Sequence, residues 1–328
     1  MGRPRRRRRV VVIGGGTGTS IVLSGLKAYP LELTAIVPVT DDGGSTGRLR
    51  DEFGFLPVGD MRQCLAALAD KDDLLRQILL YRFSKGKGLK GHNLGNLILT
   101  ALEDMMGSAP KALIAAAEIL KLKGRVLPIS LQLVKLAAEY QSGKTIVSEH
   151  RIETHRLKEG DRIVRLYTVP KARINPEAKE AILKADLIVL GPGDLFNSTI
   201  ANLVIEGTKE ALKRSRAKLV YIVNLMTLNS QTSGMTAKDH VRTIETYAGR
   251  RVSWIVVNSQ PIPQKVLEAY QKEEEYPVVD DLGTSRRIVR RPLLAERLFK
   301  KPKSDPLKRS LLRHDPQKLG RVLVGLLR

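Results

Sequence analysis

The chain has few cysteine and aromatic residues, and no apolar run in it approaches the length of a membrane span. Its one cysteine, Cys64, excludes an intramolecular disulfide, which is typical of proteins in a reducing cytoplasm. Gly14 interrupts the apolar run behind the basic N-terminus, so no signal-peptide core follows. Aromatic residues make up 4% of the chain, fewer than stacking platforms for single-stranded nucleic acid require. We therefore expect a cytoplasmic protein without a membrane segment.

Positive charge is abundant by contrast, with a formal net charge of +22 over 328 residues. Part of it lies in an arginine run, Arg5 to Arg9, which predicts a basic disordered arm over residues 1–9. Such an arm can bind phosphate-rich polymers, but a generally basic proteome or an early start codon explains it equally well. Nucleic acid is thus an expected partner only through this arm. Residues 10–328, rich enough in apolar side chains for a large core, are expected to form one domain.

Apolar runs and amphipathic stretches alternate along the chain, which predicts a parallel sheet covered by helices on both faces. The fold class is therefore α/β, a Rossmann-like three-layer parallel sheet. The period changes to two within residues 125–170, where Gln141 to Lys144 resemble a hairpin turn. We expect a small antiparallel β-rich insertion there. The expected strands are residues 10–13, 33–39, 186–190, 219–223 and 252–257.

A glycine-rich loop follows the first of these strands and opens a helix. Glycine lets backbone N–H groups approach an anion closely, and a helix N-terminus carries partial positive charge. Gly14 and Gly16 fit the dinucleotide fingerprint, but its third glycine is replaced by Thr19. A plain strand-to-helix turn is the alternative to a phosphate cradle. The residues of the candidate cradle are Gly14, Gly15, Gly16, Thr17, Gly18 and Thr19.

The second strand ends in another polar, glycine-rich loop that contains Asp41, Asp42 and Ser45. Ligands of open parallel sheets bind beyond the carboxyl ends of the strands, so this loop is expected to face the cradle. Its paired carboxylates suit a ribose hydroxyl or Mg²⁺. Asp41 and Asp42 are therefore the candidate metal ligands, although no cofactor is required. A solvated Asp-Gly turn is the alternative.

Two helix starts carry further candidates. Gly59 and Asp60 precede Arg62 at the first of these starts. The aspartate is suited either to capping the helix or to contacting a ligand, and the arginine is suited to pairing with a phosphate group. His92, Asn93 and Asn96 open the next apolar helix. These three can read a base or sugar or transfer a proton, while capping explains Asn93 equally well.

Two more strand ends complete the candidate rim. Gly191 and Gly193 precede Ser198 after one buried strand, and Asn224 follows the next. No nucleophile elbow, CxxC or HExxH is present. These residue types are suited to binding a nucleotide rather than to covalent catalysis.

The segments GGGTGTSIVLSGLK (14–27), TDDGGSTGRLRDEFG (40–54), GHNLGNLIL (91–99) and DLIVLGPGDLFNSTIANL (186–203) resemble the CofD/YvcK-like family. The family implies either a 2-phospho-L-lactate transferase acting on a deazaflavin or a YvcK-type gluconeogenesis factor. The latter proteins bind UDP-sugars and affect cell shape and carbon-source use. Residues 57–70 resemble the YvcK-type version, so the resemblance favours a UDP-sugar-binding regulator over an enzyme.

The same resemblance adds Tyr270 and Arg313 to the ligand site. Relatives often carry threonine where this chain has Pro316, so regulation through a hydroxyl there is not expected. If the chain is a transferase, Asp41, Asp42 and His92 are its candidate catalytic residues. No motif decides on a homodimer, and the arginine run does not belong to the family pattern.

Overall fold

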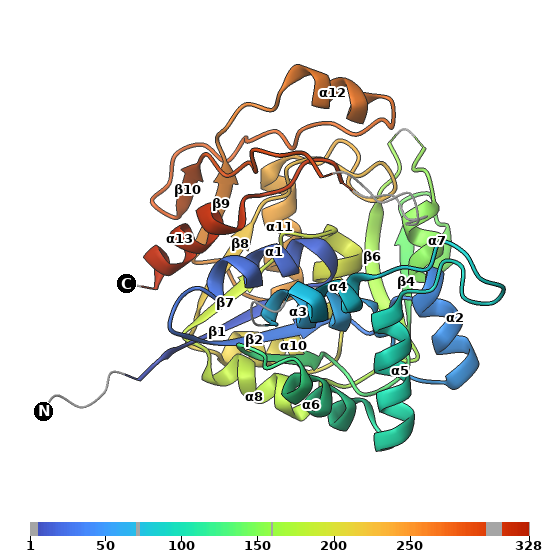
Figure 1. Ribbon diagram of the computed structural model, residues 1–328. Coiled ribbons are helices and arrows are strands. Elements are labelled where there is room, and N and C mark those ends of the chain that lie inside the picture. The colour runs from blue at the N-terminus through green and yellow to red at the C-terminus, as the bar shows by residue number, and fades with distance from the viewer. Residues whose placement is uncertain (1–5, 70–72, 159, 300–309, 328) are drawn as a thin grey trace, which may run out of the picture.

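The computed structural model describes residues 6–69, 73–158, 160–299 and 310–327. A seven-stranded sheet runs through the centre of the molecule, and its neighbouring strands pair in parallel throughout (Figure 1). In spatial order its strands are β10 (Ile288–Arg291), β9 (Trp254–Asn258), β8 (Lys218–Ile222), β7 (Leu187–Leu190), β1 (Arg8–Ile13), β2 (Leu31–Val37) and β3 (Arg125–Pro128).

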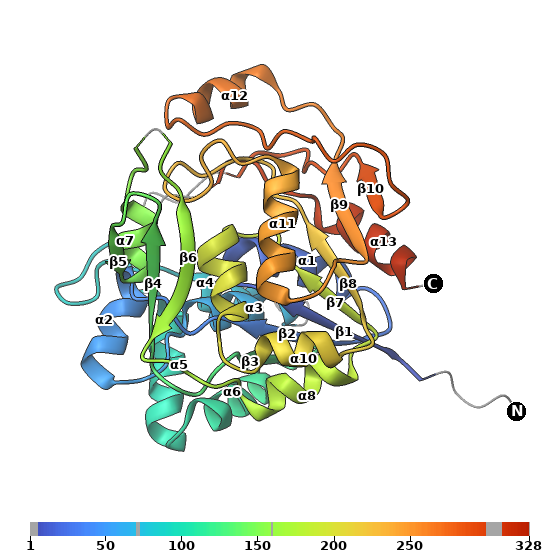
Figure 2. The same cartoon turned by 180° about the vertical axis from the view of Figure 1, so that it is seen from behind.

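The central strands are buried on both faces because helices cover each side of the sheet. All four residues of β7 are buried, as are Val10 to Ile13 of β1. One layer contains α1 (Gly16–Leu26), α3 (Gly59–Leu68) and α13 (Pro316–Leu326). Figure 2 shows the opposite layer, which contains α8 (Pro176–Lys184), α10 (Thr208–Arg214) and α11 (Ala237–Ala248). The expected Rossmann-like three-layer α/β architecture is confirmed.

The remaining helices lie outside these two groups. Toward the β3 side they are α2 (Gly44–Phe53), α4 (Asp73–Leu80), α5 (Leu94–Met106), α6 (Ala109–Ile119) and α7 (Glu149–Thr154). Three further helical elements follow later in the chain: a π-helical turn (Leu195–Ile200), α9 (Ala201–Leu203) and α12 (Gln264–Gln271). No helix in the described part of the chain is long and apolar enough to cross a membrane.

The antiparallel insertion is present, but it is smaller than predicted. It consists of β4 (Lys135–Tyr140), β5 (Thr145–Val147) and β6 (Ile163–Val169), paired in the order β5-β4-β6. The prediction of an insertion from residue 125 was wrong in its first part, because β3 pairs in parallel with β2. A four-residue apolar run does not reveal which neighbour a strand will pair with.

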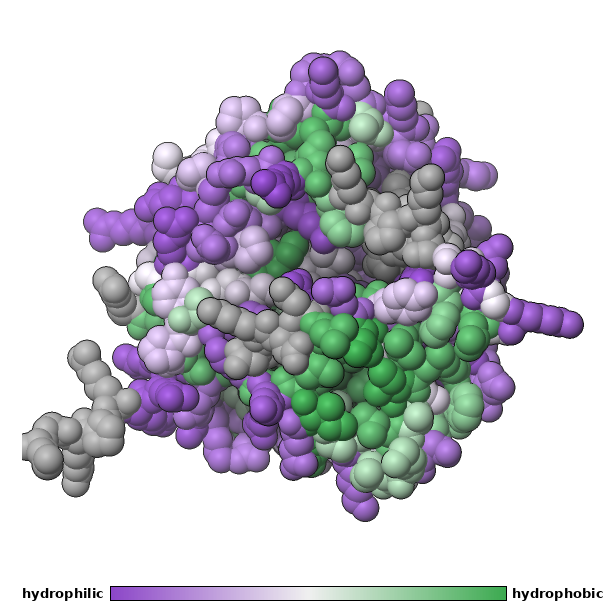
Figure 3. Space-filling view, in the orientation of Figure 1, coloured by the Kyte–Doolittle hydropathy of each residue, from purple (hydrophilic) through white to green (hydrophobic). Residues whose placement is uncertain are grey.

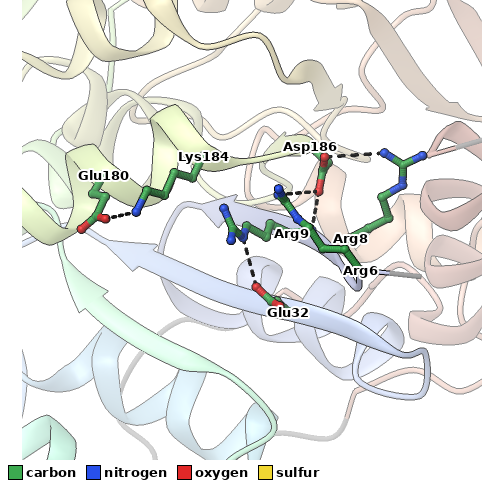
Figure 4. A network of polar contacts seen from close by, with 7 residues as sticks. All are labelled: Arg6, Arg8, Arg9, Glu32, Glu180, Lys184 and Asp186. Carbon is green, nitrogen blue, oxygen red and sulfur yellow. Dashed lines mark hydrogen bonds and ion pairs between the residues drawn. The ribbon is translucent and has the colours of Figure 1, made fainter. Parts of the chain in front are cut away.

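The arginine run ends inside the sheet. Residues 1–5 of the predicted arm lie outside the described residues, but Arg8 and Arg9 are the first residues of β1, which corrects the boundary at residue 9. The Arg9 N–H donates to the Asp186 carboxylate over 2.7 Å, and Arg6 and Arg8 pair with the same side chain (Figure 4). These contacts lie at the amino ends of the strands, away from the candidate rim.

Candidate functional site

A pocket of about 270 Å³ lies over the carboxyl ends of the central strands. The loops after β1, β2, β7 and β8 contribute to it, because parallel strands bring these ends to one edge of the sheet. Most of the predicted site residues line it. They are Gly15, Gly16, Thr17, Gly18, Asp41, Ser45, Gly59, Asp60, Arg62, Asn96, Gly193, Ser198, Asn224, Tyr270 and Arg313.

Six predicted residues do not line the pocket: Gly14, Thr19, Asp42, His92, Asn93 and Gly191. Gly14 and Thr19 support the loop from below, since the Gly14 N–H donates to the Ile36 carbonyl and Thr19 is fully buried. Gly191 is at the end of β7, where its N–H donates to the Ile13 carbonyl. These residues shape the rim without facing its cavity.

The glycine loop is occupied by a side chain of the protein itself. The Gly16 N–H, at the first residue of α1, donates to the Asp60 carboxylate over 2.8 Å. Any Cβ atom on Gly15 would collide with the same carboxylate. Gly18 allows a similarly close approach to the Pro192 carbonyl. The loop therefore brings its backbone close to a carboxylate of the protein, Asp60, and its predicted role as a phosphate cradle stays a prediction.

The structure excludes the N-cap role that the sequence allows for Asp60. The N-cap position of α3 is Val58, with no side-chain capping bond, and Asp60 is inside the helix. Its carboxylate reaches across to α1 instead. Burial, together with the charge of Asp41, raises the pKa of Asp60 to about 7. At neutral pH this carboxyl is consequently close to its titration midpoint.

Asp60 belongs to a group of three carboxyls at the base of the pocket, with Asp41 and Glu149. Burial raises the pKa of Asp41 and raises that of Glu149 well above its usual range. Glu149 accepts a short hydrogen bond from the Thr40 hydroxyl. Mutual repulsion favours protonation, or a cation, over three separate negative charges.

The predicted Asp41–Asp42 pair does not face the pocket as a pair. Asp41 lines the cavity and accepts from the Gly43 N–H over 2.9 Å. The Asp42 carboxylate points to the insertion, where it accepts from the His150 N–H over 2.8 Å. Asp41 and Asp60, rather than Asp41 and Asp42, therefore share the base of the pocket. No group of three or more potential metal ligands is preassembled among the residues that the structure describes.

Polar residues at the start of α5 form hydrogen bonds with one another and with Ser45 of α2. Asn93 caps the helix by accepting from the Asn96 N–H, and its backbone N–H donates to the Ser45 hydroxyl. His92 shares a 3.3 Å hydrogen bond with Ser45, and burial lowers the pKa of its imidazole. Of the three residues predicted here, only Asn96 lines the pocket.

Arg62 is a buried linking residue. Its Nε donates to the Asn96 side-chain oxygen over 2.7 Å, and its Nη1 donates to the Leu79 carbonyl over 3.2 Å. Arg62 is 5% exposed, it lines the pocket, and its positive charge opposes the rise that burial causes in the pKa of Asp60. The position of Arg62 in the first turn of a helix predicts that it pairs with a phosphate group of the ligand. The packing of α3 against α4 and α5 instead provides hydrogen-bond acceptors for the guanidinium within the protein.

The opposite wall combines the loops after β7 and β8 with the C-terminal segment. Asn224 donates from Nδ2 to the Gly193 carbonyl over 2.7 Å, which joins these two loops. The Leu312 N–H donates to the Tyr270 hydroxyl over 3.0 Å, so the segment 310–314 passes over the cavity. The Arg313 guanidinium stacks on Phe299, 3.3 Å from its ring centroid.

Sequence reasoning missed the contribution of the insertion. Glu149, His150 and Glu153 from α7 line the pocket, as do Arg82 and Asp194. No local motif marks the α7 residues, because α7 is a short helix between two strands of the insertion. Only the packing of the insertion against the loop after β2 brings them to the site.

The family model described as 2-phospho-L-lactate transferase CofD matches residues 10–296. The chain belongs to the CofD family. Within this family it is 38% identical to the gluconeogenesis factor of Bacillus subtilis over 96% of both chains. It is 43% identical to the gluconeogenesis factor of Halalkalibacterium halodurans, over 82% of this chain and 83% of that one.

A solved structure shows the same fold. A UPF0052 family protein from Bacillus halodurans superposes with a TM-score of 0.87 at 37% identity, covering 98% of this chain and all of that one. The resemblance seen in the sequence to the YvcK type, the gluconeogenesis factors, is thereby confirmed at the level of the family.

Proposed function

We propose that this chain binds a UDP-sugar, or a related nucleoside diphosphate, in the pocket and regulates central carbon metabolism and cell shape in response. The observation that carries the proposal is the convergence of four strand-end loops, two of them glycine-rich, on one cavity. The similarity to gluconeogenesis factors supports the regulatory role. The UDP-sugar is the ligand that the resemblance to the YvcK type implies.

The charge of the pocket sets a condition on such a ligand. A diphosphate placed at the glycine loop would face Asp60, which holds the Gly16 amide, and Asp41 beside it. Protonation of Asp60 or a divalent cation would remove this repulsion. Carboxylate oxygens of Asp41 and Asp60 are suitable donors for Mg²⁺, which also accepts phosphate oxygens. Bound there, the ion would supply positive charge to the diphosphate.

Calorimetry of the full chain with UDP-N-acetylglucosamine and Mg²⁺ tests the proposal. We expect saturable heat with this ligand and weaker binding of GDP and NAD. Arg313→Ala, on the pocket wall, should weaken binding, whereas Arg48→Ala, exposed and outside the pocket, should not. Saturable heat with NAD or GDP, and none with any UDP-sugar, would overturn the ligand assignment.

Phospholactyl transfer is the alternative, favoured by the description of the matching family model. Of its candidate catalytic residues, Asp41 lines the pocket, whereas Asp42 and His92 do not. Incubation with a lactyl-guanosine diphosphate donor, Mg²⁺ and a deazaflavin acceptor distinguishes the two functions. Formation of the phospholactyl product would replace the regulatory proposal, and its absence alongside UDP-sugar binding would support it.

A further inference from the structure

Much of the positive charge of the chain gathers at one edge of the sheet. Because the seven strands are parallel, the segments at their starts all lie at the edge opposite the ligand pocket. Most of these segments are basic: residues 6–9, 121–125, 213–218, 250–251 and 286–287. Carboxyl groups gather around the pocket instead: Asp41, Asp60, Glu149, Glu153, Asp194 and Glu275. The net charge of +22 therefore has a direction along the strands.

A groove of about 1000 Å³ occupies part of this amino edge. It lies over the start of β2, between α8 and the segment that precedes β3. Among the described residues that line it, the acidic ones are Glu32 and Glu180. The basic ones are Arg7, Arg9, Lys27, Lys123, Arg125 and Lys184. The groove is consequently positive.

Local ion pairs already neutralise the two carboxyls of the groove. Glu32 pairs with Arg9 over 3.2 Å, and Glu180 pairs with Lys184 on the same helix (Figure 4). The remaining basic side chains of the groove therefore face little opposing charge within it.

Two of these remaining side chains are well placed to meet an anion from solution. Arg7 is exposed and forms no ion pair with the residues that the structure describes. Arg125 is 61% exposed, and its one carboxylate partner, Glu177, lies 3.7 Å away and is 53% exposed. Exposed pairs of this kind contribute little free energy, so an incoming anion can replace the glutamate.

Exposed arginines continue the positive surface beyond the groove. Arg214, Arg216, Arg251 and Arg286 lie at the starts of β8, β9 and β10, and none is paired with a carboxylate in the described part of the chain. Seven strands spaced about 4.8 Å apart make this edge roughly 29 Å wide. Figure 3 shows that hydrophilic side chains predominate on the side where β1 begins, whereas a hydrophobic area lies over α4 and α5.

The chemistry of this edge fits a polymer with repeated phosphates. Arginine guanidinium groups pair with phosphate oxygens through two parallel hydrogen bonds. A row of them along about 29 Å exceeds what a single small anion can contact. Tyr29, the aromatic side chain among the described groove residues, is half-buried and can stack on one unpaired base.

A lipid surface fits this edge less well. Basic proteins that dock on membranes usually add an apolar anchor to their positive charge. Large apolar side chains are exposed elsewhere in the described part of the chain, but none of them lines the groove. The observations therefore favour a nucleic acid.

We propose that the amino edge of the sheet binds single-stranded nucleic acid, with its phosphates in the groove and along the starts of β8 to β10. The sequence limited nucleic acid to the arginine-rich arm, whereas the groove belongs to the folded part of the chain. The site lies at the opposite edge from the ligand pocket. Its occupation does not depend on the proposed UDP-sugar function.

Fluorescence anisotropy of the full chain with a labelled single-stranded oligonucleotide measures the binding. Arg7→Glu and Arg125→Glu should each weaken it by about fivefold or more, because each reverses a charge in the groove. Arg48→Glu is the matched control, since it makes the same change in net charge at an exposed position of α2 outside the groove. It should weaken binding by less than about twofold. Circular dichroism checks that all three variants are folded.

The salt dependence separates phosphate contacts from stacking. Arg125→Ala should reduce the slope of log affinity against log salt by about 0.7, the value for one lost contact to a single strand. Tyr29→Leu should weaken binding by about fivefold and leave the slope unchanged, because stacking releases no counterion. No binding by the wild type at about 50 mM salt, or binding that neither groove glutamate variant weakens, would overturn the proposal.

Three further measurements distinguish this groove from other sites and partners. The double variant Arg3→Gln with Arg5→Gln, outside the described residues, should weaken binding without abolishing it. Complete loss in this variant would assign the binding to the arm and contradict the groove. Tighter binding of a duplex than of a single strand, or binding to phosphatidylserine vesicles alone, would also contradict it.

Discussion

The backbone N–H of Gly16 donates to the carboxylate of Asp60, which places an acid of α3 at the N-terminus of α1. An internal carboxylate thus holds the position that a bound phosphate would be expected to take. Because the pKa of Asp60 is raised to about 7, this contact is sensitive to pH and to nearby cations.

Replacement of Asp60 by asparagine should stabilise the protein at pH 8. The raised pKa means that the folded state holds its proton more tightly than the unfolded state between pH 3.8 and about 7. The free energy of unfolding therefore falls as pH rises through this window. Asp60→Asn should be more stable by about 2 kcal/mol at pH 8 and nearly equal at pH 4, allowing for water in the open pocket. Urea denaturation across this range measures the difference, and a pH-independent gap would contradict the assignment.

Mg²⁺ should strengthen binding of UDP-N-acetylglucosamine to the wild type. The ion would neutralise the carboxylates of Asp41 and Asp60 that face the diphosphate. Calorimetry in Mg²⁺ and in EDTA should give affinities that differ by about tenfold or more, or ~1.4 kcal/mol. In Asp41→Asn the difference should largely disappear. Equal affinities for the wild type in both buffers would show that no cation takes part.

Gly15→Ala should disturb the loop, because the added methyl group would collide with the Asp60 carboxylate. We expect a loss of about 1–3 kcal/mol in stability and a clear loss of ligand affinity. Gly325→Ala in α13 is the control, since nothing lies within 4 Å of its added Cβ. That variant should be neutral or slightly more stable. Thermal unfolding and calorimetry measure both, and unchanged binding by Gly15→Ala would exclude the loop from the ligand site.

Arg62→Ala should destabilise the fold by about 3 kcal/mol. Its removal leaves the Asn96 side chain and the Leu79 carbonyl without their buried donor. Arg48→Ala, at an exposed position of α2, should change stability by less than about 0.5 kcal/mol. Chemical denaturation gives both values. A loss of ligand affinity without a loss of stability in Arg62→Ala would instead assign this residue to ligand binding.

Several local features could be predicted because they depend on neighbouring residues alone. Continuous apolar runs such as Leu187–Leu190 predicted buried parallel strands, and all four of these residues are buried. The convergence of the glycine loops could also be predicted, since parallel strands share an edge for their carboxyl ends. The strand β10 was missed because Ile288–Arg291 mixes apolar and charged residues at the edge of the sheet.

The amino-acid sequence by itself determined the central strands of the sheet and the edge at which a ligand site could form, because periodicity and glycine act over a few residues. Only the tertiary structure decided that Asp60 faces Gly16, that Asp42 turns toward His150, and that Glu149 of the insertion enters the pocket. These contacts join residues 44 to 108 positions apart in the chain. Their partners are selected by the packing of whole helices, which no local pattern records.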